Sequence, residues 1–178
     1  GLAFQTCSGL TSITLPKSLS SIGSQAFHGC SALASFQIDP ENTSYAIVDG
    51  VLFNKALTQL AFYLPAKPGT TYTVPGTVSS IADSAFQNCT SLTSVALPEG
   101  LTSLGAVAFA ECSGLTSITL PRSLSSIGQW ALNHCSALAS IQVDPANTSF
   151  ASADGVLFNK AMTELICYPS AKPGADAA

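Results

Sequence analysis

The cysteines of this chain recur at a constant spacing. Cys7 and Cys30, Cys89 and Cys112, and Cys112 and Cys135 are each 23 positions apart. A period in this range is typical of structural repeats that stack into a solenoid. The remaining step, from Cys30 to Cys89, covers 59 positions, which is one period plus 36 inserted residues. The spacing therefore predicts a stack of short units with an insertion between two of them.

Each unit follows one pattern of apolar residues, C-x-x-L-x-x-I-x-L-P-x-x-L-x-x-I-G-x-x-A-F-x-x-C. Apolar and polar residues alternate before the proline, which indicates a short strand with one buried face. Proline ends the strand because it has no N–H for the ladder. The glycine is expected to take unusual backbone angles where the chain changes direction. Ala-Phe is expected to fill the rear of the core from one turn of α- or 3₁₀-helix, which Asp83 would cap at Ala85–Phe86.

One unit cannot bury its apolar residues alone, so neighbouring units must cover one another. The strands are then expected to lie side by side in a parallel sheet, with their inward residues in continuous apolar ladders. The predicted strands are Ile13–Leu15, Phe36–Ile38, Tyr72–Val74, Val95–Leu97, Ile118–Leu120 and Ile141–Val143.

A longer repeat contains the insertion. Residues 3–69 align without a gap to residues 108–174, and 47 of these 67 positions are identical. The insertions, at about 39–70 and 144–174, each begin with Asp-Pro and pass through Asp-Gly, both of which favour turns. Two apolar runs follow in each, which predicts a β-hairpin. The paired runs are Val51–Phe53 with Leu60–Phe62, and Val156–Phe158 with Leu165–Cys167.

The unit resembles the leucine-rich repeat of BspA-like proteins, also called the Treponema pallidum type, with its LPxxLxxIGxxAFxxC signature. The insertion, with its DGVLFNK and AKPG motifs, is similar to segments common in that family. Five units agree with the family in spacing and residue type, over almost the whole chain. The resemblance implies a right-handed leucine-rich-repeat solenoid of short parallel strands with irregular or 3₁₀ returns. It also implies a surface or secreted protein, because family members with assigned roles bind extracellular host proteins such as fibronectin or fibrinogen.

We expect residues 1–178 to form a single solenoid domain. The first residues read as the tail of a unit, and the chain ends at GADAA, where the next strand is expected. These features predict that the sequence is a fragment of a longer protein.

The surface is expected to be neutral and rich in hydroxyl groups. Charged residues make up only 9% of the chain, against roughly 25% in typical soluble domains. The formal charge of −4 and the scattered basic residues argue against nucleic acid as a partner. No apolar run approaches the roughly 20 residues that a membrane-spanning helix needs.

The sequence predicts no enzyme activity, no cofactor and no metal site. Equivalent cysteines in stacked units point the same way, which is a poor arrangement for disulfides, so buried free thiols are expected. No two cysteines have the C-x-x-C spacing of a zinc site. His134 beside Cys135 suggests a nucleophile and its base, but this cysteine is expected to be buried. Motifs for serine hydrolases, P-loop nucleotide binding and zinc proteases are absent from the sequence.

Acidic residues recur in both insertions and leave a calcium site conceivable. They lie close to Asn42 and Asn147, but their spacing matches no EF-hand, and turn chemistry explains the same residues. Three N-glycosylation sequons, which begin at Asn42, Asn88 and Asn147, are expected to arise by chance in a chain so rich in Ser and Thr. The recurring acids are Asp39, Asp49, Asp144 and Asp154.

The outward positions of the strands are the candidate binding residues. Stacking turns them into two columns of small, uncharged groups, interrupted by Ala96. Such a surface serves either as a soluble coating or as a docking face for a protein or glycan. The array is similar to that of ice-binding solenoids, but Gln, Ala and the insertions argue against that role. The candidates are Ser12, Thr14, Ser35, Gln37, Thr71, Thr73, Ser94, Ser117, Thr119, Ser140 and Gln142.

The function predicted from these features is a non-enzymatic interaction module, a cell-surface or secreted adhesin that binds a host or matrix protein. The strand surface or the hairpins would make the contact, since exposed loops often carry function. The alternatives are a structural spacer that displays another domain and a glycan-binding appendage. Both ends of the stack are expected to be uncapped, which favours end-to-end self-association.

Overall fold

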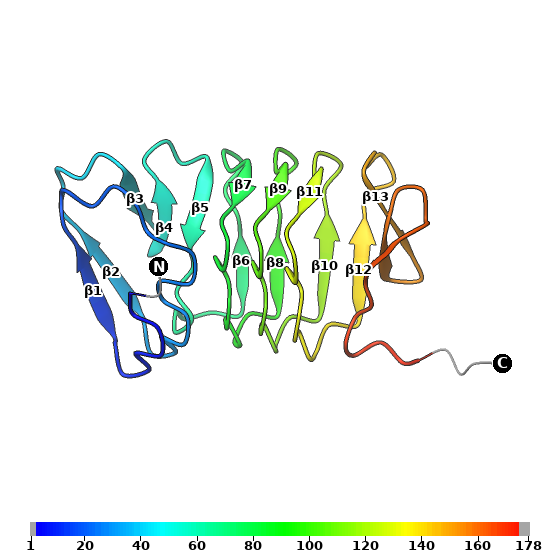
Figure 1. Ribbon diagram of the computed structural model, residues 1–178, viewed down its shortest axis with the longest axis horizontal. Helices are drawn as coiled ribbons and strands as arrows, with labels where there is room; N and C mark the ends of the chain where they lie inside the picture. The colour runs from blue at the N-terminus through cyan, green and yellow to red at the C-terminus, as the bar shows by residue number, and fades with distance from the viewer. Residues whose placement is uncertain (1–2, 175–178) are drawn as a thin grey trace.

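The structure, a computed structural model, describes residues 3–174. It is a solenoid in which each 23-residue unit forms one turn, here called a rung, and successive rungs lie side by side (Figure 1). One column of strands carries the predicted alternating segments, and all six lie within one residue of their expected positions. The column comprises β1 (Ser12–Leu15), β2 (Ser35–Ile38), β6 (Thr71–Thr73), β8 (Ser94–Ala96), β10 (Ser117–Leu120) and β12 (Ser140–Val143).

The strands of this column pair in parallel, as predicted, at the 23-residue offset. Ser12 lies opposite Ser35 in the β1–β2 pair, and Ser117 lies opposite Ser140 in the β10–β12 pair. The ladder is divided into three pairs, β1–β2, β6–β8 and β10–β12, and is not one continuous sheet. In Figure 1, β1 and β2 lean away from the upright β6, β8, β10 and β12, and the first insertion lies between the two groups.

A second column of strands lies on the return side of the solenoid. It contains β7 (Ser80–Ile81), β9 (Ser103–Leu104) and β11 (Ser126–Ile127), which pair in parallel with one another. This column was not predicted from the sequence, because two-residue strands are too short to show alternation. The buried side chains of Ile81 and Leu104 face the core, and the serines before them point outward.

Each insertion is a three-stranded antiparallel meander, one strand more than the predicted hairpin. The first contains β3 (Tyr45–Val48), β4 (Val51–Asn54) and β5 (Gln59–Phe62), and the second contains β13 (Phe150–Ala153), β14 (Val156–Asn159) and β15 (Leu165–Cys167). Asp49 and Gly50 join β3 to β4 with φ angles of 50° and 76°. Two positive φ angles are the geometry of a type I′ turn, which Asp-Gly favours in hairpins.

The Ala-Phe segments are hydrogen-bonded turns, and no residue between 3 and 174 is helical. The expected helical or 3₁₀ turn is therefore wrong, and so is the predicted cap. Asp83 Oδ1 accepts a hydrogen bond from the N–H of Ala106, in the next rung, at 2.7 Å. Each turn is flanked by residues with positive φ, such as Ser84 (59°) and Asn88 (62°). That backbone conformation alternates with the right-handed one and prevents a helix.

The glycines that follow Leu104 and Ile127 are required for space, not for their backbone angles. A Cβ on Gly105 would lie 2.6 Å from the carbonyl carbon of Ala82, and one on Gly128 would lie 2.5 Å from that of Gly105. Neither glycine has a positive φ. The expectation of unusual dihedrals at this position is therefore wrong, because adjacent rungs bring their backbones into contact there.

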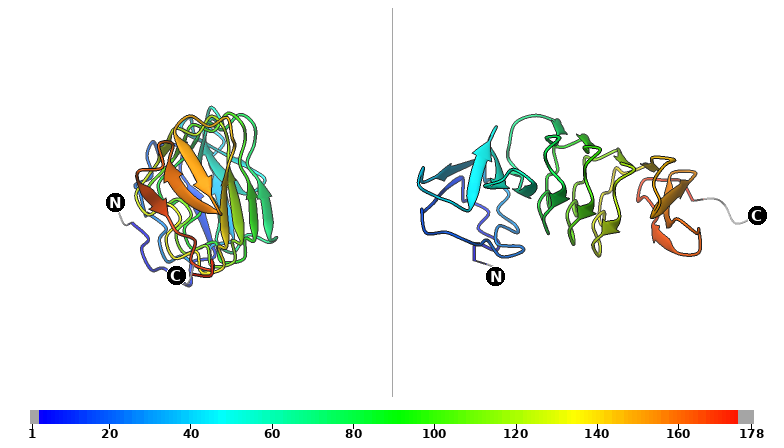
Figure 2. Two further views of the ribbon diagram at one scale, coloured as in Figure 1. Left: turned by 90° about the vertical axis from the view of Figure 1, so that its right-hand side faces the viewer. Right: turned by 90° about the horizontal axis from the view of Figure 1, so that it is seen from above.

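The apolar core is divided at the first insertion. The larger cluster runs through the regular rungs, where Phe86 stacks on Phe109 with ring centroids 4.7 Å apart. The smaller cluster lies under β1, β2 and the first insertion, where Phe27 packs edge-on against Phe36 and Phe62. Figure 2 shows, from above, the first insertion between the N-terminal rungs and the regular ones. The single domain over residues 1–178 stays a prediction.

Candidate functional site

The predicted binding residues lie on one side of the first strand column, called here the strand face. Their side chains point outward, and all are exposed except Ser140, which is half-buried. They alternate with buried residues such as Ile118, Leu120 and Ile141, as the period of two requires. The structure places Ser12, Thr14, Ser35 and Gln37 on β1–β2, and Thr71, Thr73, Ser94, Ser117, Thr119, Ser140 and Gln142 on β6, β8, β10 and β12.

The strand face is therefore two surfaces and not one pair of unbroken columns. On the N-terminal surface, Thr14 Oγ1 donates a hydrogen bond of 3.3 Å to Gln37 Oε1 of the next strand. No ladder joins β2 to β6, because the chain leaves the column after β2 to form the first insertion. The other surface, called here the β6–β12 surface, is formed by β6, β8, β10 and β12 and brings seven of the predicted residues together.

A groove of about 290 Å³ crosses the β6–β12 surface where the ladder is interrupted between β8 and β10. Ser94, Ser117 and Thr119 line it together with Ala96. At its rim Arg122 Nε lies 3.6 Å from Glu99 Oε2, and both side chains are exposed. Exposed ion pairs of this kind contribute about 0–1 kcal/mol. Glu99 and Asp144 also line the groove, so it is a hydroxyl surface with two carboxylates, one of which is in a weakly held ion pair.

A second groove, of about 400 Å³, lies on the return side and was not predicted from the sequence. Its walls are the return segments of the first and third rungs, and Phe62 and Ala61 of β5 form its floor. The available signal was a difference in spacing. Five positions separate Ile from Phe in the regular units, whereas three separate Leu60 from Tyr63.

The cysteines give the solenoid neither disulfides nor a reactive centre. The six thiols are free, as expected, and four of them are buried, but the expected burial is wrong for Cys7, and Cys167 is only half-buried. Burial raises the pKa of the Cys135 thiol to about 11, and it raises the pKa of Cys89 well above the ordinary value. His134 beside Cys135 is exposed, whereas the thiol is turned into the core. Cys7 differs from the other repeat cysteines because it is exposed.

The asparagines of the two insertions tie each insertion to the rung before it. Asn147 Nδ2 donates to the carbonyls of Pro121 and Leu124 at 2.8 and 2.9 Å, and its Oδ1 accepts from the N–H groups of Ser149 and Phe150. Asn42 makes the equivalent bonds in the first insertion, and both side chains are buried.

The recurring acids take part in turns and surface contacts. Asp39 and Asp144 each accept a hydrogen bond from the N–H two residues on, which is the Asx-turn explanation. Among residues 3–174, no three His, Cys, Asp or Glu side chains lie close enough together to hold a metal ion.

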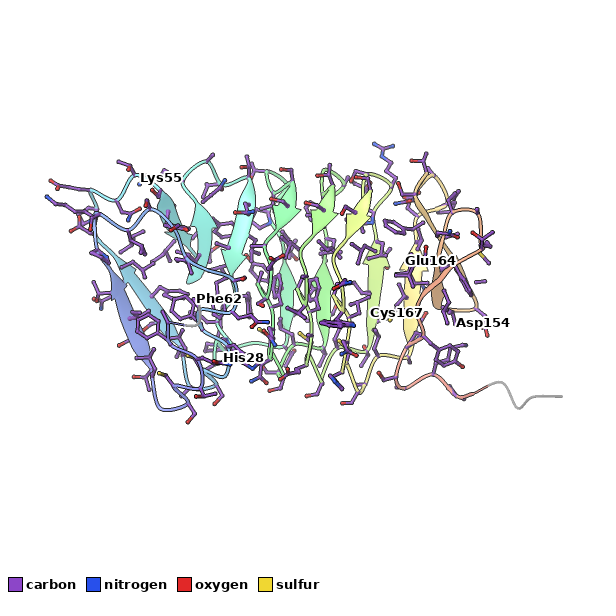
Figure 3. All side chains as sticks on the ribbon, viewed as in Figure 1. His28, Lys55, Phe62, Asp154, Glu164 and Cys167 are labelled. Atoms are coloured by element: carbon purple, nitrogen blue, oxygen red, sulfur yellow. The ribbon has the colours of Figure 1, made fainter. Side chains whose placement is uncertain are left out.

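The last meander exposes an apolar edge. Leu165 of β15 is 56% exposed, whereas its counterpart Leu60 in the first insertion is fully buried under β7. Ile166 and Tyr168 are exposed beside it. Figure 3 shows Cys167 of this strand and Asp154 at the end of the described solenoid. No described helix is long and apolar enough to cross a bilayer.

Comparison with known proteins agrees with this geometry. Residues 2–66 and 55–166 match the family model described as the BspA type leucine rich repeat region, in six copies. No curated protein matches the chain.

Three solved structures of bacterial proteins are similar to the chain. A leucine-rich repeat protein from Eubacterium ventriosum is 31% identical with a TM-score of 0.71, over 75% of this chain and 36% of that one. The pneumococcal vaccine antigen PcpA is 28% identical with a TM-score of 0.67, over 80% and 41%. A leucine rich cell surface protein from Faecalibacterium prausnitzii is 29% identical with a TM-score of 0.60, over 93% and 47%. The chain thus spans less than half the length of each.

Proposed function

This chain belongs to the BspA-type leucine-rich repeat family, and from that premise we propose that it is a non-enzymatic adhesin that binds a host or extracellular-matrix protein. The β6–β12 surface is the contact. Proteins of the leucine-rich repeat type are typical interaction or surface proteins, and two of the similar structures are a cell surface protein and a vaccine antigen. We assign a cell-surface or extracellular location to this chain.

The observation that carries the proposal is the groove between β8 and β10. It lies on an exposed surface of hydroxyl and amide groups, and Glu99 and Asp144 are the charged residues of its lining, so a protein can cover most of it without removing many ions from water. Such a surface gives hydrogen bonds at low desolvation cost, and stacking over several rungs supplies the area that a protein interface needs.

Binding to purified fibronectin and fibrinogen tests the proposal. The whole chain should bind at least one of them saturably when it is immobilised on a biosensor. Replacing Thr119 and Gln142 by Arg should weaken binding at least tenfold, while Ser136→Arg, an exposed change away from this surface, should leave it unchanged. Circular dichroism should show that the double variant Thr119→Arg, Gln142→Arg and the Ser136→Arg variant are both folded like the unmodified chain.

The other outcomes decide between the alternatives. Binding to neither matrix protein but to a glycan array would support the glycan-binding appendage. Binding to nothing would support the spacer. Equal weakening by Ser136→Arg would place the contact elsewhere.

We also propose that copies of this chain associate end to end. In the first insertion, the rung that contains β7 covers Leu60 and Tyr63, whereas the same positions of the second insertion, Leu165 and Tyr168, are exposed. A second copy offers half-buried Ile13, Leu19 and Ile22 along a groove of about 450 Å³ on its N-terminal rung. This head-to-tail contact would build open chains of molecules. Sedimentation velocity should show concentration-dependent oligomers that Leu165→Lys removes, and a strictly monomeric mass at high concentration would exclude them.

A further inference from the structure

The regular rungs show how one return segment hydrogen-bonds to the next. Alternate N–H groups of each turn donate to alternate carbonyls of the following turn, and the pattern repeats between the next two rungs. In the first of these steps, Ser84, Phe86 and Asn88 donate to Ala106, Ala108 and Ala110 at 2.9, 2.7 and 2.9 Å. One residue before each turn, a bond runs the other way, from the N–H of Gly105 to the carbonyl of Ile81 at 2.8 Å.

The second rung follows this pattern with a shorter chain. Its return begins with β5, since Leu60 pairs with Ile81 of β7. The N–H of Tyr63 then donates to the carbonyl of Ala85 at 2.7 Å, and the Tyr63 ring stacks on Phe86. Tyr63 thus takes the place of the repeat phenylalanine. The return is two residues shorter than its neighbours, at the position where the third rung has Asp83 and Ser84.

The missing residues leave the return-side groove. Gly23, Ser24 and Gln25 of the first rung form one wall, and Ala82, Asp83 and Ser84 of the third rung form the other. Figure 3 shows Phe62, part of the groove floor, in the interior between the N-terminal strands and the regular rungs. A volume of about 400 Å³ lies within the range of known ligand sites, about 300–1,000 Å³.

The walls present main-chain groups that the regular rungs always pair. Within residues 3–174, the carbonyl of Ile22, the N–H of Gln25 and the carbonyl of Asp83 have no hydrogen-bond partner. In the regular stack these same groups bond to a neighbouring return. Ser84, which is only 2% exposed and lines the groove, has no partner for its Oγ. Of these groups only the Ser84 hydroxyl is buried, so an occupant that bonds to it would satisfy a buried polar group, whereas Ile22 and Gln25 are half-buried and Asp83 is exposed.

Gly105, Ala106 and Val107 show what an occupant must supply. Gly105 donates its N–H to the preceding rung, Ala106 accepts at its carbonyl from Ser84, and Val107 donates to the following rung. Three consecutive residues of any extended chain carry the same donor, acceptor and donor, and each has an open counterpart in the groove. Small side chains fit best, because a Cβ at the Gly105 position meets the backbone of the preceding rung.

We propose that this groove binds a short, uncharged, extended peptide segment of a partner protein, which supplies the main-chain bonds of the shortened second return. The segment donates to the Ile22 carbonyl, accepts from the Gln25 N–H and donates to the Asp83 carbonyl. In this binding mode the peptide adds one segment to the ladder of repeats. Its main-chain hydrogen bonds provide the affinity, and the size of its side chains determines the selectivity. The inference rests on the proposed function as a protein-interaction module, at a site opposite the strand face.

The probe is the capped peptide Ser-Leu-Gly-Ala-Val-Ala-Phe, the sequence of residues 103–109, titrated into the ¹⁵N-labelled whole chain. The amide resonance of Gln25 should shift saturably, while the paired amide of Phe109 should not. A control peptide with N-methyl groups on its Gly and Val nitrogens lacks both donors and should bind at least tenfold more weakly. Before any peptide is added, the Gln25 amide should exchange with solvent at least a hundredfold faster than the paired Ser84 amide.

Variants taken from the second copy of the longer repeat block the groove without new backbone strain. Gln25→Trp and Ala61→Ile introduce the residues found at Trp130 and Ile166, and Trp130 has a similar positive φ. The double variant should weaken peptide binding at least tenfold and leave matrix-protein binding through the strand face unchanged. Thr119→Arg should weaken matrix-protein binding and leave peptide binding unchanged.

The proposal and the proposed function can fail separately. Slow exchange at Gln25, or no shift there with the peptide while matrix proteins still bind, would overturn the groove proposal alone. Peptide binding at Gln25 without any matrix-protein binding would overturn the strand-face adhesin alone. Equal binding of the N-methylated peptide would show that the main-chain bonds are not made, and would also overturn the groove proposal.

Discussion

The thiol of Cys112 donates a hydrogen bond of 3.0 Å to the carbonyl oxygen of Phe86, one rung away. Cys135 makes the same bond to Phe109 at 3.1 Å, and Cys30 makes it to Phe4 at 3.0 Å. The repeat cysteine is therefore a buried donor that joins neighbouring turns. A thiolate cannot donate this bond, so the bond and burial both favour the protonated thiol.

Thiol labelling should distinguish one cysteine from the others. At pH 8 a water-soluble thiol reagent should modify Cys7 rapidly, because that side chain is exposed. The four buried thiols should react only after unfolding in denaturant, and the half-buried Cys167 should react slowly. Cys7→Ser should abolish the rapid phase. Rapid labelling of Cys112 in the native protein would contradict the buried ladder.

Alkaline pH should destabilise the protein through the same thiols. The pKa of Cys135 is raised from 9.0 to about 11, first because the thiol is buried. Above pH 9 the unfolded chain loses this proton while the folded chain keeps it, so the free energy of unfolding falls as pH rises. The raised pKa of this thiol alone should lower the free energy of unfolding by about 2 kcal/mol between pH 9 and pH 11. Urea unfolding across this range measures the fall, which should be shallower in Cys135→Ala.

Gly128→Ala should destabilise the fold by about 1–3 kcal/mol. The added methyl group would lie 2.5 Å from the carbonyl carbon of Gly105, and backbone cannot move aside as a side chain does. Ala82, at the same repeat position in the third rung, is the natural control, because the shortened return before it leaves room. Ala82→Gly should therefore change the free energy of unfolding by less than about 1 kcal/mol. Thermal melts that rank the two variants the other way would contradict the packing argument.

Asn147→Ala should lower the free energy of unfolding by about 3 kcal/mol or more. The substitution leaves two buried carbonyls and two N–H groups without their hydrogen-bond partner. Asn133, an exposed asparagine of the return that begins with β11, provides the matched control, and Asn133→Ala should be nearly neutral. Denaturant unfolding of both variants measures the difference. A loss below about 1 kcal/mol at Asn147 would show that the insertion is held by other contacts.

A glycan on Asn42 or Asn147 should be incompatible with the native fold. Both Nδ2 atoms donate to carbonyls of the preceding rung, and both residues are only 1% exposed. When the chain is expressed in a secreting eukaryotic cell, where glycans are added before folding is complete, intact mass spectrometry of the natively folded fraction should therefore show no glycan at either site. A glycan at Asn147 in protein with an unchanged melting temperature would contradict the buried position of this side chain.

Much of the fold could be predicted because stacking repeats the same chemical demand at each unit. Ile13, Ile118 and Ile141 alternate with polar residues, and the strands lie within one residue of the predicted ranges. The third strand of each insertion was missed because Tyr45–Val48 is apolar without alternation, so nothing separated it from the turn before it. The glycine was misinterpreted because sequence shows which residue is small, but not which backbone approaches it.

The sequence by itself determined the period, the parallel strands and the outward positions of Thr119 and Gln142, because burial alternates with every residue of a strand. Tertiary structure decided how the insertions enter the stack. The antiparallel turns of the first insertion return β5 to the ladder at Leu60, two residues short of a full return, and only the third rung beside it makes that a groove. The two-residue shortening of the second return produces a groove only because stacking holds Gln25 and Asp83, which are distant in sequence, on either side of it.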